Sequence, residues 1–166
     1  EANITVHGHE QLLSEMIVTA SRDPPMTDLA RTHGANGINI AGICCTANEI
    51  LMRHGIPIAG NFLQQELAIT TGAVEAMVVD VQCVMQSLQS VASCYHTKLI
   101  TTNPKADITG SVRMEFNEHD ALNSARAIVT AAVENFRNRK GEVLIPKAKA
   151  PMIAGFSHET VNYMLG

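Results

Sequence analysis

The sequence predicts an α/β fold: a mainly parallel β-sheet flanked by helices, in a Rossmann-like arrangement of three layers. Short β-rich runs alternate with helical patterns along the chain, which is typical of parallel sheets with crossover helices. Hydrophobic residues make up 46% of the chain and charged residues 17%, so the chain can bury a core. The length of 166 residues suits one domain, and we expect residues 1–166 to form a single Rossmann-like domain.

Strands in the first half are predicted from short apolar runs bounded by turn residues. They lie at residues 3–6, 37–43 and 56–59. Helices are predicted from apolar residues three and four positions apart, with proline or glycine ending each pattern. They lie at residues 12–17, 26–32, 46–52 and 63–71. Cys44, Cys45 and Thr46 are expected to form the exit turn of the second strand, with Thr46 capping the helix that follows.

The clearest strand of the chain is predicted in the second half, at residues 76–81. Further strands are predicted at residues 98–101, 143–145 and 152–156. A helix is expected at residues 88–91, and the longest helix, at residues 118–139, carries apolar side chains on one broad face. Ser157 should cap a final helix that runs through Met164.

Composition excludes several classes of function. The net charge of −4 and the pI of about 6.0 provide no basic face for nucleic acid. No apolar run reaches the roughly 18 residues of a membrane-spanning helix, and no secretory signal opens the chain. Four cysteines are few for a disulfide-stapled protein, so a reducing, cytoplasmic compartment is expected. Because Glu1 precedes the first strand so closely, we interpret the chain as a piece excised from a longer polypeptide.

Metal-binding residue types follow three of the predicted strands. His7 and His9 follow the first, Cys45 follows the second, and Cys83 follows the strand at residues 76–81. Because the carboxyl ends of parallel strands lie at one edge of a sheet, these side chains are expected to converge there. Imidazole and thiolate are ligands that iron, nickel and zinc prefer. His9, Cys45 and Cys83 are therefore predicted metal ligands, and a site that needs a fourth must take it from elsewhere.

Two simpler interpretations remain open for these residues. A cysteine after a strand is often a buried apolar side chain, in which case the domain is a scaffold whose thiols are core residues. A second alternative is an isolated module that holds zinc or iron without turnover. Cys94 is predicted to be structural, because its place before the strand at residues 98–101 puts it at the opposite edge of the sheet.

The remaining charged and glycine-rich features are predicted to be structural. Glu66 and Asp80 would suit acid–base chemistry as a pair, but a helix-surface charge and a loop-positioning carboxylate are the favoured interpretation. Glu49 and Arg53 should form an exposed ion pair along a helix. The glycine series at residues 34–42 precedes a strand, so it is not a dinucleotide-binding fingerprint. Basic residues at the end of the longest helix should only offset its dipole. They are Arg137, Arg139 and Lys140.

Several stretches of the sequence resemble one known enzyme family. They are V-H-G-H-E (6–10), G-I-C-C-T-A-N-E-I-L-M-R-H-G (42–55), N-F-L-Q-Q-E-L-A (61–68), V-D-V-Q-C (79–83), A-S-C-Y-H-T-K-L-I-T-T (92–102) and A-G-F-S (154–157). On these motifs the whole chain resembles the nickel-type, anaerobic carbon monoxide dehydrogenases. Gln11 and Gln86 depart from the pattern, because proline is usual in the family at both positions. Glutamine should loosen these two turns slightly, but it removes no ligand.

The resemblance implies that this chain is the middle, Rossmann-like domain of a catalytic subunit. The active site of that subunit is a nickel–iron–sulfur cluster (Ni-4Fe-4S type), which interconverts CO and water with CO₂, electrons and protons. By motif matching, His9 and Cys45 correspond to ligands of an iron outside the cubane-like part. Cys83 corresponds to a ligand of another cluster iron, and Cys44 to the non-ligating member of its pair. The remaining ligands would come from outside this chain, so the isolated chain is expected to be inactive.

The resemblance also implies partners for the chain. They are the remainder of the same subunit, a second subunit in a homodimer, and a ferredoxin-type electron acceptor. It leaves open whether an acetyl-CoA synthase partner is bound.

Overall fold

One β-sheet organises the computed structural model, which describes residues 1–82, 84–148, 151 and 157–166. Within these residues the sheet has six strands, all parallel, in the order β3-β2-β1-β4-β5-β6. The strands are β1 (Ala2–His7), β2 (Ile38–Ile43), β3 (Ile58–Gly60), β4 (Val74–Val79), β5 (Lys98–Thr101) and β6 (Val112–Arg113). The prediction of a mainly parallel sheet is confirmed. The strand predicted at residues 152–156 and the candidate ligand Cys83 lie outside the described residues.

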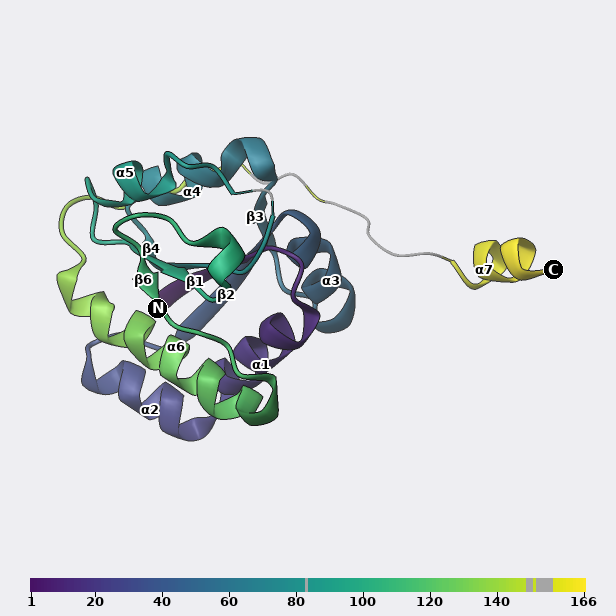
Figure 1. Ribbon diagram of the computed structural model, residues 1–166, viewed down its shortest axis with the longest axis horizontal. Helices are drawn as coiled ribbons and strands as arrows, with labels where there is room; N and C mark the ends of the chain where they lie inside the picture. Colours follow the sequence, from purple (N-terminus) through teal and green to yellow (C-terminus); the bar gives the residue numbers. More distant parts are fainter. Residues whose placement is uncertain (83, 149–150, 152–156) are drawn as a thin grey trace.

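Helices cover both faces of the sheet, which produces the three layers of the predicted fold (Figure 1). The first face carries α1 (Gln11–Arg22), α2 (Pro24–Thr32), α3 (Cys44–His54) and α6 (Ala121–Asn135). The second face carries α4 (Gln65–Thr70) and α5 (Leu88–Ala92). Short 3₁₀ helices lie at η1 (Phe62–Gln64), η2 (Pro104–Ala106), η3 (Glu118–Asp120) and η4 (Phe136–Asn138).

Side chains that alternate along the central strands form one core on each face. Every residue of β4 is buried, as expected for a parallel strand that is covered on both sides. Ile4 and Val6 of β1 lie in the core under α1 and α6. Met77 and Val79 of β4 lie in the core under α4 and α5. The two central strands are thereby fixed in the interior, and the loops that leave their ends start from rigid positions.

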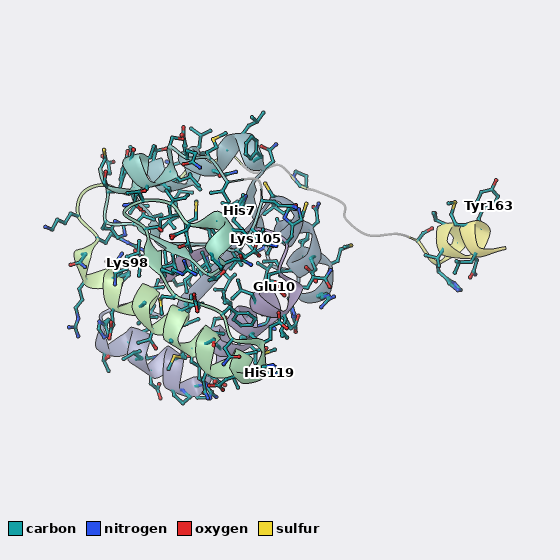
Figure 2. The ribbon with its side chains drawn as sticks, viewed as in Figure 1. His7, Glu10, Lys98, Lys105, His119 and Tyr163 are labelled. Carbon is teal, nitrogen blue, oxygen red and sulfur yellow. The ribbon has the colours of Figure 1, made fainter. Side chains whose placement is uncertain are left out.

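The predicted helices are present, with shifted ends. α2 begins at Pro24 and not at residue 26, because proline is tolerated in the first turn of a helix but not in its interior. The longest helix, predicted at residues 118–139, is α helical only over Ala121–Asn135, with the 3₁₀ helices η3 and η4 on either side. Gly55 ends α3 in the left-handed conformation, with a φ of 66°. Ser157 caps α7 (His158–Leu165) by accepting a hydrogen bond from the backbone N–H of Thr160. All residues of α7 are exposed, and Figure 2 shows Tyr163 on this helix.

The start of α3 corrects the sequence prediction. Cys44, Cys45 and Thr46 are not an exit turn: they form the first turn of α3, and Ile43 is its N-cap without a side-chain hydrogen bond. Thr46 is therefore not a helix cap. Its hydroxyl instead donates to the backbone oxygen of Gly8 at 2.8 Å, and its backbone N–H donates to the same oxygen at 3.2 Å. A tertiary contact to the loop after β1 has replaced the local cap that the sequence suggests.

Two further predictions about strands need correction. Residues 143–145 are not a strand; the backbone N–H of Leu144 donates instead to the oxygen of Thr71 at 2.8 Å, at the end of α4. β6 was not predicted, because two exposed residues carry no alternation of apolar and polar side chains that a sequence pattern can detect. Neither difference changes the order of the central strands.

Arg139 also departs from its prediction. It was expected only to offset the dipole of the longest helix, but its guanidinium group binds the buried carboxylate of Glu75 in β4. Its Nη2 atom also donates to the backbone oxygens of Glu1 and Ala73, at 2.9 and 3.0 Å. Arg139 therefore ties the end of α6 to the amino edge of the sheet.

In the part of the chain that the structure describes, no helix has the length and apolar character to cross a membrane.

Candidate metal centre

The strand order places the predicted ligands at a recognised type of binding position. The chain moves from β1 outward to β2 and β3, and then returns to the other side of β1 to form β4. In open α/β sheets, ligands bind beyond the carboxyl ends of the strands, at the point where the order reverses. His9 follows β1 and Asp80 follows β4, so the loops that carry them flank this reversal point. Cys45 follows β2, the other neighbour of β1.

The turn that carries His9 is fixed by hydrogen bonds to its backbone. The N–H of His9 donates to both carboxylate oxygens of Asp80, at 2.9 and 3.0 Å, and the N–H of Glu10 donates to Asp80 Oδ2 at 2.7 Å. The ring Nδ1 of His9 lies 3.4 Å from the backbone oxygen of Val81. A carbonyl oxygen only accepts, so this contact is a hydrogen bond when Nδ1 carries a hydrogen. In that tautomer of the imidazole, the lone pair of Nε2 is available to a metal ion.

Cys45 lies in the first turn of α3 and is exposed. It lines a cavity of about 390 Å³, together with Cys44 and Asn48 of α3 and with residues of β3 and η1 such as Phe62. Exposure at a strand end is not what the scaffold interpretation expects for this thiol. The side chain is instead accessible to a ligand that approaches the carboxyl edge of the sheet.

The described donors suit a soft or borderline metal, but they do not complete a site. His9 offers an imidazole nitrogen and Cys45 a thiol, which are ligand types for iron, nickel and zinc. Among residues 1–82, 84–148, 151 and 157–166, no three His, Cys, Asp or Glu side chains are grouped closely enough to hold a metal ion. Cys83, the third predicted ligand, lies outside the described residues. A closed coordination sphere would need it and further ligands from another part of the protein.

Asp80 binds the loop instead of pairing with Glu66. It is 2% exposed, and it accepts hydrogen bonds from the backbone of His9, Glu10 and Val81. Burial raises the pKa of this carboxyl group, and these backbone donors act in the opposite direction. Glu66 accepts a hydrogen bond from the hydroxyl of Ser87. The prediction of a loop-positioning carboxylate is confirmed for Asp80, although two of its partners, His9 and Glu10, lie too far away in the sequence to be identified from it.

His7 is the last residue of β1 and is fully buried; it is labelled in Figure 2. Neither ring nitrogen has a hydrogen-bond partner among the described residues. Burial, and to a lesser extent the charge of His9, lowers the pKa of His7 from 6.5 to about 4. His7 is therefore a neutral, interior residue and not an edge donor like His9.

This environment of His7 predicts a loss of stability in mild acid. Between about pH 6.5 and pH 4 the unfolded chain binds a proton at His7 that the folded chain does not bind. The stabilising contribution is complete above pH 6.5, and up to about 3 kcal/mol of unfolding free energy is lost by pH 4. Urea unfolding at several pH values would measure this slope, and His7→Phe should flatten it. Replacement of the exposed His119 is the control, and it should leave the slope of the unfolding free energy against pH unchanged. If His7→Phe also leaves this slope unchanged, His7 is not the group responsible.

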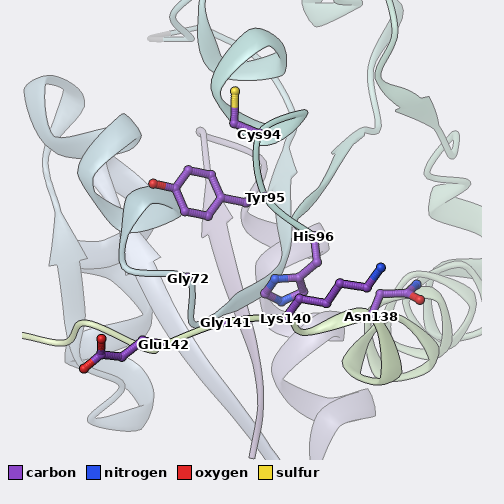
Figure 3. A pocket seen from close by; sticks show the side chains of 8 residues that line it. All are labelled: Gly72, Cys94, Tyr95, His96, Asn138, Lys140, Gly141 and Glu142. Carbon is purple, nitrogen blue, oxygen red and sulfur yellow. The ribbon is translucent and has the colours of Figure 1, made fainter.

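Cys94 lies at the opposite edge of the sheet, as predicted. It precedes β5 and borders a cavity of about 480 Å³ that is also lined by Tyr95, His96 and Lys140 (Figure 3). Its thiol is exposed and donates to the backbone oxygen of Ser90 at 3.5 Å. Cys94 is thus separated from His9 and Cys45 by the length of the strands, and it is not a core residue.

The ion pair predicted on α3 is present. Arg53 Nη2 lies 3.1 Å from Glu49 Oε1, four residues away, and the arginine side chain is half exposed. Such a pair contributes little to stability, and it has no part in the site.

Comparisons with known proteins show which family and which relatives this chain is similar to. Residues 1–158 match the Prismane/CO dehydrogenase family. Carbon monoxide dehydrogenase 1 from Methanosarcina mazei is 60% identical over 167 aligned residues, which cover 100% of this chain and 27% of that protein. The carbon monoxide dehydrogenase/acetyl-CoA synthase subunit beta of Moorella thermoacetica is 47% identical, over 99% of this chain and 25% of that protein.

A solved structure shares the fold. The nickel-free crystal structure of carbon monoxide dehydrogenase from Thermococcus sp. AM4 superimposes with a TM-score of 0.92 and 52% sequence identity, covering 99% of this chain and 26% of that chain. The present chain thus spans about a quarter of the length of the relatives that it matches.

Proposed function

The chain belongs to the Prismane/CO dehydrogenase family, and we propose that it forms the middle domain of a nickel–iron–sulfur carbon monoxide dehydrogenase subunit. The observation that carries this proposal is the presence of an imidazole and an exposed thiol beside the reversal point of the sheet. The activity belongs to the complete subunit: the interconversion of CO and water with CO₂, two electrons and two protons.

In this proposal His9 and Cys45 would bind one iron, outside the cubane-like part of the cluster, Cys83 would bind another cluster iron, and Cys44 is not a ligand. When bound, the cluster would polarise CO and activate water. The chain itself supplies two ligands of different type, an imidazole and a thiolate, on neighbouring strand ends. Such a mixed set suits an iron that must keep one coordination position open for water better than four thiolates would.

Hydrogen bonds between the loops support a shared role for His9 and Cys45. Thr46 follows Cys45 directly, and it donates twice to the backbone oxygen of Gly8, which precedes His9. These two hydrogen bonds fix the position of the first turn of α3 relative to the turn after β1. Both ligands would then be positioned before any metal binds, which reduces the entropy that binding must overcome.

The proposal includes partners beyond this chain. The remaining cluster ligands would come from the rest of the same subunit. The complete subunit would form a homodimer in the cytoplasm of an anaerobic cell. It would pass electrons to a ferredoxin-type acceptor. The name of the Moorella relative supports an acetyl-CoA synthase as a further partner. Each of these follows from the family and not from a surface of this chain.

A comparison of the complete subunit with the isolated chain tests the proposed function. The complete subunit, produced without oxygen, should contain nickel and iron and oxidise CO with an artificial electron acceptor. The isolated 166-residue chain should be inactive, because it lacks the remaining ligands. CO oxidation by the isolated chain would overturn this assignment of roles. A complete subunit that binds zinc alone through His9 and Cys45 would support a metal-binding module instead.

A further inference from the structure

Asp80 has an environment that is unusual for a buried carboxylate. It is 2% exposed, and the hydrogen bonds described for it come from backbone N–H groups instead of a basic side chain. Two of these donors, His9 and Glu10, lie in the turn after β1, and the third, Val81, is its own neighbour. Hydrogen bonds to an ionised carboxylate are among the stronger ones in proteins, so this carboxylate rigidly joins the ends of β1 and β4.

Gly8 leaves the space that this carboxylate occupies. Its φ is +139°, a value that side-chain-bearing residues rarely adopt. A Cβ atom added to Gly8 would lie 1.6 Å from Asp80 Oδ1 and 2.1 Å from Asp80 Cγ. The carboxylate therefore sits where a side chain of residue 8 would be, and the two residues are complementary in shape.

The same contacts also orient the imidazole of His9. Asp80 fixes the backbone of His9, and the next residue, Val81, accepts the hydrogen bond from the ring Nδ1. The position of the backbone and the rotation of the ring are thus both determined by residues 80 and 81. The chain continues from these residues to Cys83.

We propose that Asp80 is a positioning residue for the metal centre: its buried carboxylate holds the His9 turn against the strand end that leads to Cys83. This inference rests on the proposed role of His9 as a ligand. A carboxylate accepts at both oxygens, whereas the side chain of asparagine has one acceptor and an N–H₂ group. Asp80→Asn therefore keeps the volume but places a donor against backbone donors, which should loosen the turn without removing a ligand.

The test uses the complete subunit that contains this chain, produced without oxygen with iron and nickel supplied. Asp80→Asn should lower the CO oxidation rate about 10- to 100-fold, the range observed when a partner of a metal ligand is lost. The folded variant should also contain less iron and nickel per subunit, and its Mössbauer spectrum should show an altered histidine-bound iron. Asp107→Asn is the matched control, because Asp107 is exposed and binds only Arg113 among the described residues, at 3.4 Å.

A second pair of variants separates this inference from the proposed function. His9→Ala should remove the same iron signal completely; if it leaves metal content and spectrum unchanged, the proposed function itself fails. If His9→Ala removes the signal while folded Asp80→Asn keeps the parent spectrum and metal content, only the positioning inference is overturned. If Asp80→Asn does not fold, Asp80→Ser takes its place in the comparison, because it removes the carboxylate without placing an N–H₂ group against the backbone donors.

Discussion

Cys45→Ala in the complete subunit is expected to reduce CO oxidation to background and to lower the iron content. Cys45 is exposed at the carboxyl end of β2, next to the loops that carry His9 and Asp80. Removing a thiolate ligand opens the coordination sphere of an iron, and no described Cys lies near enough to replace it except Cys44. The loss of activity should be larger than the decrease of about 10- to 100-fold that is typical when a residue that only supports a ligand is changed.

Two other cysteines of the chain provide matched controls. Cys94→Ala changes an exposed thiol at the opposite edge of the sheet, so it should keep the parent's activity and metal content. Cys44→Ala tests the non-ligating member of the adjacent pair, and it should keep the metal. Iron and nickel analysis, together with CO oxidation by each purified variant, measures the difference. If Cys45→Ala and Cys94→Ala behave alike, Cys45 is not a ligand.

The central part of the fold was predictable because its signals are local. β1, β4 and β5 are short apolar runs, and β4 is buried along its whole length, so the sequence pattern and the burial coincide. Parallel strands then bring the residues after β1 and β2 to one edge, wherever the intervening helices begin or end. The positions of His9 and Cys45 at this edge were accordingly predicted without knowledge of the tertiary contacts.

The details of the site were not predictable, because they depend on partners that are distant in the sequence. Asp80 binds backbone groups 70 and 71 positions away. Thr46 looks like a helix cap locally, but its hydroxyl bonds to Gly8, 38 positions away. Cys44 has a φ of 59°, which a residue other than glycine seldom adopts, so the early start of α3 had no local signal. In each case a tertiary contact outweighs the local preference.

Glu75→Ala is expected to lower the unfolding free energy of the 166-residue chain more than substitution of any exposed residue does. The Glu75 side chain is fully buried at the amino edge of the sheet. Arg139 donates to both of its oxygens at 2.7 Å, the backbone N–H of Asn3 donates at 2.6 Å, and His96 Nε2 lies 2.9 Å away. The carboxylate thus joins β1, β4, the loop before β5 and the end of α6.

Removing this carboxylate leaves several polar groups without their partner. The side chain of His96 is 4% exposed and the hydrogen bond from the N–H of Asn3 is part-buried, so water replaces the lost hydrogen bonds only in part. Breaking a buried ion pair by removing one member costs about 3–5 kcal/mol, and this is the decrease expected in the unfolding free energy of Glu75→Ala. Urea unfolding followed by circular dichroism measures it. Glu134→Ala, on the exposed side of α6, is the matched control and should change the value by less than about 0.5 kcal/mol.

A double-mutant cycle distinguishes the ion pair from the volume that Glu75 fills. Arg139→Ala leaves the buried carboxylate without its cation, and it should be nearly as costly as Glu75→Ala. The double variant should then be more stable than the sum of the two single losses predicts, by about 0.5–3 kcal/mol, because the second change removes a group that is already unpartnered. Additive losses would mean that packing, and not charge, is what Glu75 contributes. Arg139 would then stabilise the end of α6 through Phe136, whose ring centre lies 4.6 Å from its guanidinium carbon, and through the oxygens of Glu1 and Ala73.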